Sequence, residues 1–370
     1  MTLQDLKPKI WSACDVLRSQ GFHITDYMEQ ITYLMFLKNL DEKEENDKEL
    51  DKALGREHKP LFDDEKFYWK NWTQKSGRPL VKFVKNDLFS KLTDINGRNP
   101  IVKKIFKDAV FTIEEPQAFK KVIGIIDSIQ FYKQPIDVKG ATYEFLLSKL
   151  AEAGAAGEFF TPRHIIRAMV EIVDPKIGET ICDPAMGTGG FLIGALNHIL
   201  ESNGDGYGDG RNLTNEQFAF LHDETFFGYE QNRRTYRMAL MNMYLHGANN
   251  PKLERINTLG DGTHTERKYD VIFANPPYGG KIDNVRGNFT IATNKTELLF
   301  LQHIVQTLKE GGRAGVILPE GVMFQSGAAQ KIREILLNQC ETFTVVSMPA
   351  GIFQPYTGVK TDLLFFKKGL

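Results

Sequence analysis

Helical and β-rich segments alternate through the second part of the chain, from about residue 141 onward. Helical patterns such as RHIIRAMVEIV and IGALNHILES are separated by short runs of β-branched and aromatic residues. The β-rich runs are ETICDPA, TFFGYE, LERINT, YDVIFA, AGVILPE, FTVVSMP and DLLFFKK. Alternation at this spacing predicts a doubly wound α/β sheet, whose ligands bind at the carboxyl ends of the strands.

The first part of the chain, residues 1–134, has the pattern of a mostly helical domain. The segments DYMEQITYLMFLKNL and FKKVIGIIDSIQFY both place apolar residues at helical spacings. The charged run at 41–59 between them is a solvated loop or a solvated helix face. Because 370 residues exceed what one ordinary core holds, we expect a helical domain at 1–134 and an α/β domain at 135–370.

Composition and charge exclude several classes of protein. Hydrophobic residues make up 42% of the chain and charged residues 25%, as in soluble globular proteins. No apolar run approaches the roughly 20 residues of a membrane helix, and the amino terminus has no signal-peptide core. The three cysteines have no metal-ligand spacing. We therefore expect a cytoplasmic protein without structural zinc. Because the net charge is −1, we expect any electrostatic attraction to a polyanion to come from a local patch of the surface.

The segment DPAMGTGGF, residues 183–191, joins the first predicted strand to a helix. Its glycines allow a tight turn and a close approach of a ligand to the helix N-terminus. The spacing is not that of the dinucleotide fingerprint GxGxxG, and a tight turn without a ligand is the alternative. The candidate binding residues are Asp183, Ala185, Gly187, Thr188, Gly189 and Gly190.

Acidic residues follow the next two predicted strands. Glu230 ends the second strand, where a carboxylate can accept hydrogen bonds from the ribose hydroxyls of an adenosine-type cofactor. Asp261 follows the third strand and could accept from an exocyclic amine such as adenine N6, although the residue on its own favours an ordinary Asp-Gly turn.

The fourth predicted strand ends in FANPPYGG, residues 273–280. Two adjacent prolines cannot donate to a ladder, so they end the strand in a rigid elbow. An aromatic exocyclic amine is a poor nucleophile, and two acceptors on its N–H groups free its lone pair. The Asn275 side-chain oxygen and the Pro276 carbonyl could be these acceptors, with Pro277 stiffening the backbone. Tyr278 offers a face on which a base rotated out of a duplex can stack.

This arrangement suits methyl transfer to an amine. A sulfonium cofactor brings an electrophilic methyl group, so that alignment and electrostatic activation suffice, without a metal or a covalent enzyme intermediate. The bland alternative for the elbow is a polar turn that caps a buried strand. Its position beside a glycine-rich turn and a strand-end glutamate favours the functional interpretation.

The chain closely resembles the modification (M) subunit of type I restriction–modification systems, an adenine-N6 DNA methyltransferase. The resemblance covers most of the chain and rests on GEFFTPRHI, DPAMGTGGF, FGYEQN, NTLGDGT, FANPPYGG, GGRAGVILPEGVMF and FQPYTGVKTDLLFF. The order of these motifs is similar to that of the γ-type amino-methyltransferases. The resemblance implies S-adenosyl-L-methionine as cofactor, DNA as substrate, and specificity (S) and restriction (R) subunits as partners.

The resemblance also implies roles that the residues alone do not assign. The segment around Glu158, Phe159, Thr161 and Pro162 would close over the methionine part of the cofactor. The same segment can be a helix start, with Thr161 as N-cap and Pro162 at the first helical position. Tyr356 and Lys360 would border the target-base pocket, or belong to an ordinary turn.

Alternatives remain for the substrate and the partners. NPPY motifs also serve methyltransferases that act on RNA or on protein glutamine, and a non-catalytic cofactor-binding scaffold of a restriction complex is a third hypothesis. In the resembled family a helical tail follows the sheet and grips the specificity subunit, whereas this chain ends at FFKKGL. Stable assembly with a specificity subunit is therefore the least supported of the expectations that the resemblance implies.

Overall fold

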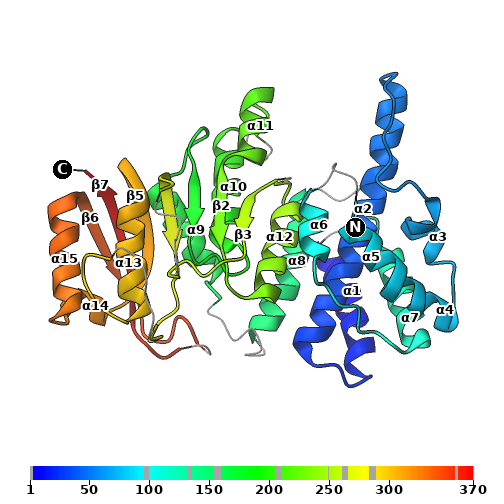
Figure 1. Ribbon diagram of the computed structural model, residues 1–370, viewed down its shortest axis with the longest axis horizontal. Coiled ribbons are helices and arrows are strands. Elements are labelled where there is room, and N and C mark those ends of the chain that lie inside the picture. The colour runs from blue at the N-terminus through cyan, green and yellow to red at the C-terminus, as the bar shows by residue number, and fades with distance from the viewer. Residues whose placement is uncertain are drawn as a thin grey trace. The chain divides into compact units, whose positions relative to one another are not determined.

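The computed structural model describes residues 3–95, 100–131, 136–152, 160–204, 210–248, 250–260, 266–282, 289–354 and 357–369 (Figure 1). Contacts within the chain divide it into two compact units. Unit 1 comprises Met1–Ala156 with Tyr244–Gly247, and unit 2 comprises Gly157–Met243 with Ala248–Leu370. None of the described helices is long and apolar enough to span a lipid bilayer.

Unit 1 is helical, as the periodicity of its sequence predicts. Its elements are α1 (Leu3–Arg18), α2 (Ile24–Ala53), the 3-10 turn η1 (Glu65–Phe67), α3 (Trp69–Trp72), α4 (Gly77–Lys82), the π-helical segment η2 (Phe83–Leu88), α5 (Phe89–Thr93), α6 (Pro100–Phe106), α7 (Pro116–Asp127) and α8 (Ile136–Glu152).

Helix α2 forms the centre of unit 1. Every residue from Tyr27 to Leu37 is buried, which is typical of a helix surrounded by other helices, and α1, α7 and α8 pack against it. The charged run that begins at Asp41 continues the helix to Ala53 and is mostly solvated. This run is therefore a helix face over most of its length, one of the two alternatives that the sequence leaves open.

Helix α8 groups with unit 1 rather than with the α/β unit. It packs against α1 and α2, and Tyr143 and Leu146 on it are buried. The compact units consequently divide after Ala156, whereas the sequence analysis expects the boundary after residue 134. The sequence pattern predicts that this segment is helical, but it does not show which core the helix joins.

Unit 2 contains one seven-stranded sheet in the order β3-β2-β1-β4-β5-β7-β6. The strands are β1 (Ile181–Asp183), β2 (Phe226–Tyr229), β3 (Lys252–Glu254), β4 (Tyr269–Ala274), β5 (Leu308–Pro319), β6 (Cys340–Ser347) and β7 (Thr361–Lys368). The first five strands run parallel, and β7 is antiparallel to both β5 and β6. Each β-rich run of the sequence contributes one strand, and the doubly wound α/β fold is confirmed.

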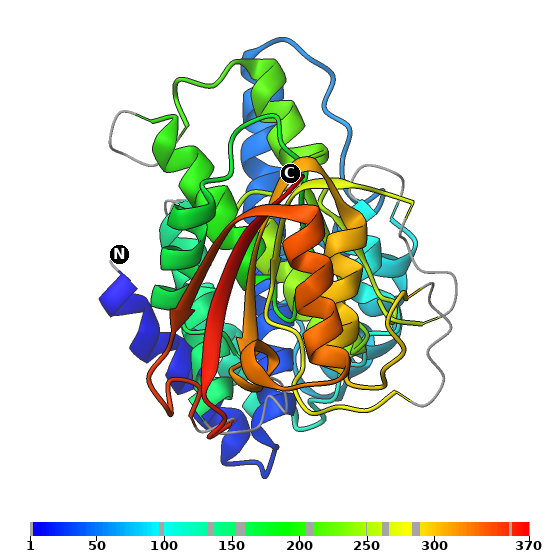
Figure 2. The same ribbon diagram turned by 90° about the vertical axis from the view of Figure 1, so that its left-hand side faces the viewer.

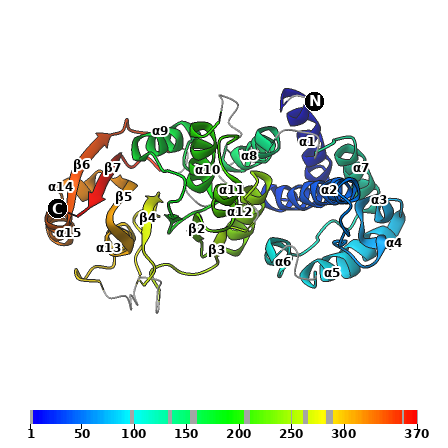
Figure 3. The same ribbon diagram turned by 90° about the horizontal axis from the view of Figure 1, so that it is seen from above.

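Helices cover both faces of this sheet. They are α9 (Arg163–Val173), α10 (Gly190–Ser202), α11 (Asn215–Asp223), α12 (Arg233–Leu245), α13 (Thr296–Thr307), α14 (Gly321–Phe324) and α15 (Ala328–Gln339). Ala314 and Val316 of β5 share a core with α13 and α15, whereas Gly315 between them faces Met169 and Val173 of α9. Because side chains alternate along a strand, α9 lies on the opposite face from α13 and α15 (Figures 2 and 3).

The sheet order reverses direction at β1 and β4. Strands β1, β2 and β3 follow one another outward on one side, and the chain then crosses to β4 and β5 on the other side of β1. Phe273 of β4 also stacks on Phe191 of α10, with ring centroids 5.4 Å apart. In doubly wound sheets, ligands bind at the point where the strand order reverses, so the carboxyl ends of β1 and β4 are the expected site.

Candidate active site

The two motifs singled out by the sequence follow neighbouring strands. Strands β1 and β4 pair in parallel, with Ile181 opposite Val271 and Cys182 opposite Ile272. The turn that starts at Asp183 and the elbow that starts at Asn275 therefore leave the same edge of the sheet side by side.

Asp183 ends β1 as a buried carboxyl. Only 1% of its surface is exposed, and its Oδ1 accepts a hydrogen bond from the Ala185 N–H at 3.0 Å. Burial raises the pKa of this carboxyl to about 8. The charge of Glu230 also raises this pKa, whereas the hydrogen bond from the Ala185 N–H lowers it. The hydrogen bond of Asp183 therefore orients the start of the turn, and burial disfavours ionisation of its carboxyl.

The turn itself depends on glycine. Gly187 and Gly189 have φ angles of 52° and 83°, in the left-handed region that residues with a Cβ rarely adopt. Gly190 begins α10, and a Cβ on it would come within 2.9 Å of Ile166 Cδ1. The Thr188 carbonyl accepts from Asn242 Nδ2 at 2.9 Å, which ties the turn to α12.

Space lies open above the turn at Gly187. A Cβ built there would meet no atom of the described residues within 4 Å. The N-terminus of α10 carries unsatisfied N–H groups and a positive partial charge. A ligand with anionic or accepting groups can therefore approach the backbone at this point.

Glu230 follows β2 and is half-buried. Its Oε1 accepts from the Asn232 N–H at 2.6 Å, and Asn232 Oδ1 in turn accepts from the Arg234 N–H at 2.9 Å at the start of α12. The carboxylate is thus held in one orientation, and its charge is close enough to influence Asp183.

The side chain of Asn275 is buried, with 9% of the residue exposed. Its Nδ2 donates to Thr161 Oγ1 at 2.9 Å, and its Oδ1 accepts from the Tyr278 hydroxyl. Burial raises the pKa of the Tyr278 phenol far above its usual range, so the hydroxyl stays protonated and able to donate. Pro276 is buried and Pro277 exposed.

The first turn of α13 holds the elbow from the other side. Thr296 Oγ1 donates to the Pro277 carbonyl at 2.9 Å, and the Gly279 N–H donates to Glu297 Oε2 at 3.3 Å. A Cβ on Gly280 would lie 2.9 Å from Thr296 Cγ2, so this glycine permits the close approach. Thr296 and Glu297 are functional candidates that the sequence analysis missed, although the TE pair at the start of an apolar helix pattern was a usable signal.

The segment before α9 differs from the predicted helix start. Helix α9 begins at Arg163, with Pro162 at the N-cap position and no side-chain cap. The alternative of Thr161 as N-cap and Pro162 as first helical residue is therefore wrong by one residue. The Thr161 hydroxyl instead contacts Asn275.

The remaining candidates from the sequence either lie outside the described residues or make contacts with residues other than those of the elbow at 275–280. Glu158, Phe159, Asp261 and Tyr356 are not among the residues that the structure describes. Lys360 is exposed and pairs with Glu320 at the end of β5, with 2.5 Å between Nζ and Oε1. Ala185 packs against the small cluster of Leu259, Leu299 and Phe300. Among the described residues no group of His, Cys, Asp and Glu side chains could hold a metal ion.

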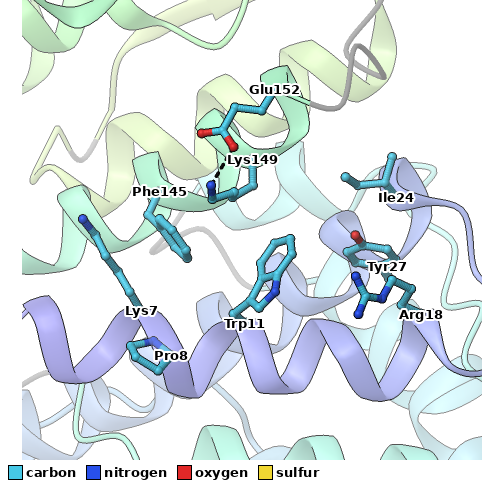
Figure 4. A pocket seen from close by; sticks show the side chains of 9 residues that line it. All are labelled: Lys7, Pro8, Trp11, Arg18, Ile24, Tyr27, Phe145, Lys149 and Glu152. Carbon is cyan, nitrogen blue, oxygen red and sulfur yellow. Dashed lines mark hydrogen bonds and ion pairs between the residues drawn. The ribbon is translucent and has the colours of Figure 1, made fainter.

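A separate cleft of about 730 Å³ lies within unit 1 (Figure 4). Its aromatic lining comes from α1, α2 and α8, where Trp11 meets Phe145 edge-on with ring centroids 6.3 Å apart. Lys149 borders it and pairs with Glu152 at 2.6 Å. None of the strand-end residues contributes to this cleft.

Comparisons with known proteins agree with this geometry. The family model for N-6 DNA methylases matches residues 134–370, and the model for the HsdM N-terminal domain matches residues 6–126. The methylase subunit of the type I restriction enzyme EcoEI from Escherichia coli is 37% identical over 356 residues, which span 92% of this chain and 70% of that protein.

Two solved structures share the whole fold. A crystal structure of a type I modification subunit from Vibrio vulnificus YJ016 is 30% identical, with a TM-score of 0.86 over 99% of this chain and 82% of that one. A structure from a study of complex assembly in the type I restriction–modification system is 35% identical, with a TM-score of 0.81 over 100% of this chain and 75% of that one. The chain therefore belongs to the N-6 DNA methylase family, among the methylase subunits of type I restriction enzymes.

Proposed function

We propose that this enzyme transfers a methyl group from S-adenosyl-L-methionine to the N6 amine of an adenine rotated out of duplex DNA. The observation that carries the proposal is the elbow at the end of β4, where a buried amide stands beside a rigid carbonyl. Asn275 Oδ1 and the Pro276 carbonyl would accept the two N–H bonds of the amine, drawing its nitrogen toward tetrahedral geometry.

The residues at the end of β1 fit the cofactor. The open space above Gly187 would admit the amino-acid part of the cofactor to the N-terminus of α10. The carboxylate of Glu230, oriented by Asn232, would accept from the ribose hydroxyls. Asp183, Ala185, Thr188, Gly189 and Gly190 would shape the turn, with Glu158, Phe159, Thr161 and Asp261 as further candidate contacts. When bound, the cofactor supplies an electrophilic methyl group.

The chain's own residues would supply alignment and electrostatics. The elbow follows β4, the strand next to β1 and its turn, so that the two motifs would bring nucleophile and electrophile together. The Tyr278 ring would stack on the extruded base. The amine gains a positive charge during transfer and its proton passes to water, because a low-pKa product cation needs no strong base.

We further propose that sequence specificity comes from a separate specificity subunit, with a restriction subunit completing the complex in the cytoplasm. The likeness to a chain from a type I assembly supports this. The net charge of −1 does so too, since it leaves most of the electrostatic attraction to DNA to another polypeptide.

The test is a methylation assay with three substrates. The purified chain, with the specificity subunit of its system, is given cofactor with a labelled methyl group and duplex DNA, RNA or a glutamine-bearing peptide. We expect label only in DNA, and N6-methyladenine as the product in digested nucleosides analysed by mass spectrometry. Label in RNA or in the peptide but not in DNA would replace this function by one of the alternatives. Binding of cofactor without transfer to any substrate would indicate a scaffold.

A further inference from the structure

The amide of Asn275 has one productive orientation. It must direct its oxygen toward the incoming amine, because an NH₂ group in that position would place donor against donor. A rotation of 180° about the last side-chain bond exchanges the two groups with little change in shape. A buried asparagine at a reaction centre therefore needs neighbours that hold it.

Thr161 is placed to be such a neighbour. Its Oγ1 lies 2.9 Å from Asn275 Nδ2, on the side of the amide away from Oδ1. The following residue, Pro162, is the N-cap of α9, and its carbonyl accepts from the Ile165 and Ile166 N–H groups. Helix α9 packs against α10 and β5, so the backbone beside Thr161 is fixed to the sheet.

The second neighbour of the amide is of a different kind. Tyr278 donates to Asn275 Oδ1, the same oxygen that the target amine would use. An entering base must share this oxygen with the Tyr278 hydroxyl or displace it. The contact between Asn275 Nδ2 and Thr161 involves the other end of the amide and can persist through the reaction.

We propose that Thr161 is a positioning residue for methyl transfer, whose hydroxyl holds Asn275 Nδ2 so that Oδ1 faces the target amine. The inference rests on the proposed function of the elbow. It differs from the role that the family resemblance implies for this segment, which is closure over the cofactor. The two roles predict different kinetic losses.

The experiment compares Thr161→Val, which keeps the shape and removes the hydroxyl, with Thr161→Ser, which keeps the hydroxyl. We expect Thr161→Val to lower kcat about tenfold to a hundredfold, because it leaves a buried amide donor without its acceptor. The dissociation constant of the cofactor stays within about twofold. Thr161→Ser restores kcat to within about threefold of the unmodified chain.

Thr307→Val is the matched control. Thr307 is 1% exposed and its hydroxyl donates to the His303 carbonyl, but it stands at the opposite end of α13 from Thr296. Thr307→Val likewise removes a hydrogen bond of a buried threonine hydroxyl, and we expect kcat to remain unchanged. An equal loss of kcat in both variants would reduce the effect to general destabilisation and overturn the proposal.

A second outcome also overturns it. If Thr161→Val weakens cofactor binding tenfold or more while kcat at saturating cofactor is normal, Thr161 serves the cofactor and not the amide. In an Asn275→Ala background, Thr161→Val should cause no further loss of the residual rate, because the group that it positions is absent.

A readout independent of activity separates this inference from the proposed function. The side-chain NH₂ resonances of Asn275 can be assigned in chain labelled with ¹⁵N-asparagine, by their absence in Asn275→Ala. We expect them to shift in Thr161→Val and to return near their original positions in Thr161→Ser. Unchanged resonances in Thr161→Val would disprove the contact even if the enzyme methylates adenine. If these resonances shift in Thr161→Val but the unmodified chain methylates no DNA, the contact between Thr161 and Asn275 is supported and the proposed function is overturned.

Discussion

The ends of β1 and β4 lie next to each other but are built differently. At the end of β1, backbone conformation decides the structure, because two glycines adopt positive φ angles and a buried carboxyl binds the main chain two residues later. At the end of β4, side chains decide it, since Asn275 contacts Thr161 from the segment before α9 and the elbow rests on Thr296 from α13. The first strand end is shaped mainly by residues close in sequence, with one contact from Asn242 of α12, whereas the second is assembled from three distant segments.

This difference indicates a division of labour. A turn made of backbone N–H groups suits a cofactor that is the same in every catalytic cycle. An amide held by side chains suits a target base that must enter and leave. Substitutions at the two strand ends should accordingly affect different steps.

The largest expected effect is at the β4 end. Asn275→Ala should lower methyl transfer by about 10²–10³-fold or more, as the loss of one preorganised polar group at a reaction centre does, while cofactor affinity changes less than twofold. Isothermal calorimetry with the cofactor and a single-turnover assay measure the two quantities. A parallel loss of cofactor affinity would show that the two strand ends are not separate in function.

At the end of β2, Glu230→Ala should produce the opposite pattern. We expect cofactor binding to weaken by about 1.5–3 kcal/mol, the range for a hydrogen bond to a charged group, while the rate at saturating cofactor is retained. Asn203→Ala is the control, because it removes a hydrogen bond from a side-chain amide to the Ile199 carbonyl at the end of α10. An unchanged dissociation constant in Glu230→Ala would remove this residue from the cofactor site.

In the β1 turn, Gly189→Ala should weaken cofactor binding by about 1–2 kcal/mol, the cost of a left-handed conformation for a residue with a Cβ. Its Cβ would meet only ordinary contacts with Met243 and Ala239, so strain and not collision is the expected cause. Gly124→Ala, inside α7 with open space around it, is the matched control and should leave binding unchanged. Equal affinities in both variants would argue that the turn does not hold the cofactor.

The smallest effect concerns pH. The folded-state pKa of Asp183 is raised from 3.8 to about 8, so its contribution to stability is present below pH 4 and is lost as the pH rises toward 8. Between pH 6 and 7 the unmodified chain should lose at most about 1.4 kcal/mol of unfolding free energy relative to Asp183→Asn. Denaturant unfolding at both pH values measures this. A difference that stays constant or grows in favour of the unmodified chain would contradict a raised pKa for the buried Asp183 carboxyl.

Much of the fold could be predicted from the sequence because its signals are local. Alternating helical and β-rich runs predict the strands of unit 2 and some of its helices, and the helical pattern RHIIRAMVEIV coincides with α9. Only the first two residues of the third run, LERINT, belong to a strand, because β3 spans Lys252–Glu254. The membership of α8 in unit 1 depends on tertiary packing and not on composition.

The candidate site could be predicted only in part for the same reason. The glycine turn and the elbow are contiguous motifs with stated chemistry. The partners of the elbow are not contiguous, since 114 residues separate Thr161 from Asn275 and 19 separate Pro277 from Thr296. A short motif predicts which atoms react, but the contacts that orient those atoms come from the order of strands in the sheet.

The central claim is that Asn275 and Pro276 grip an adenine amine opposite a methylsulfonium bound at β1. A crystal structure of the chain with sinefungin, whose amine replaces the methylsulfonium group, tests it most directly. The account predicts that the ribose of the ligand meets Glu230 and that its amine points toward Asn275 Oδ1, with room for a flat purine beside Tyr278. A ligand whose amine faces away from residues 275–278, or lies against them with no room for a base, would contradict the account.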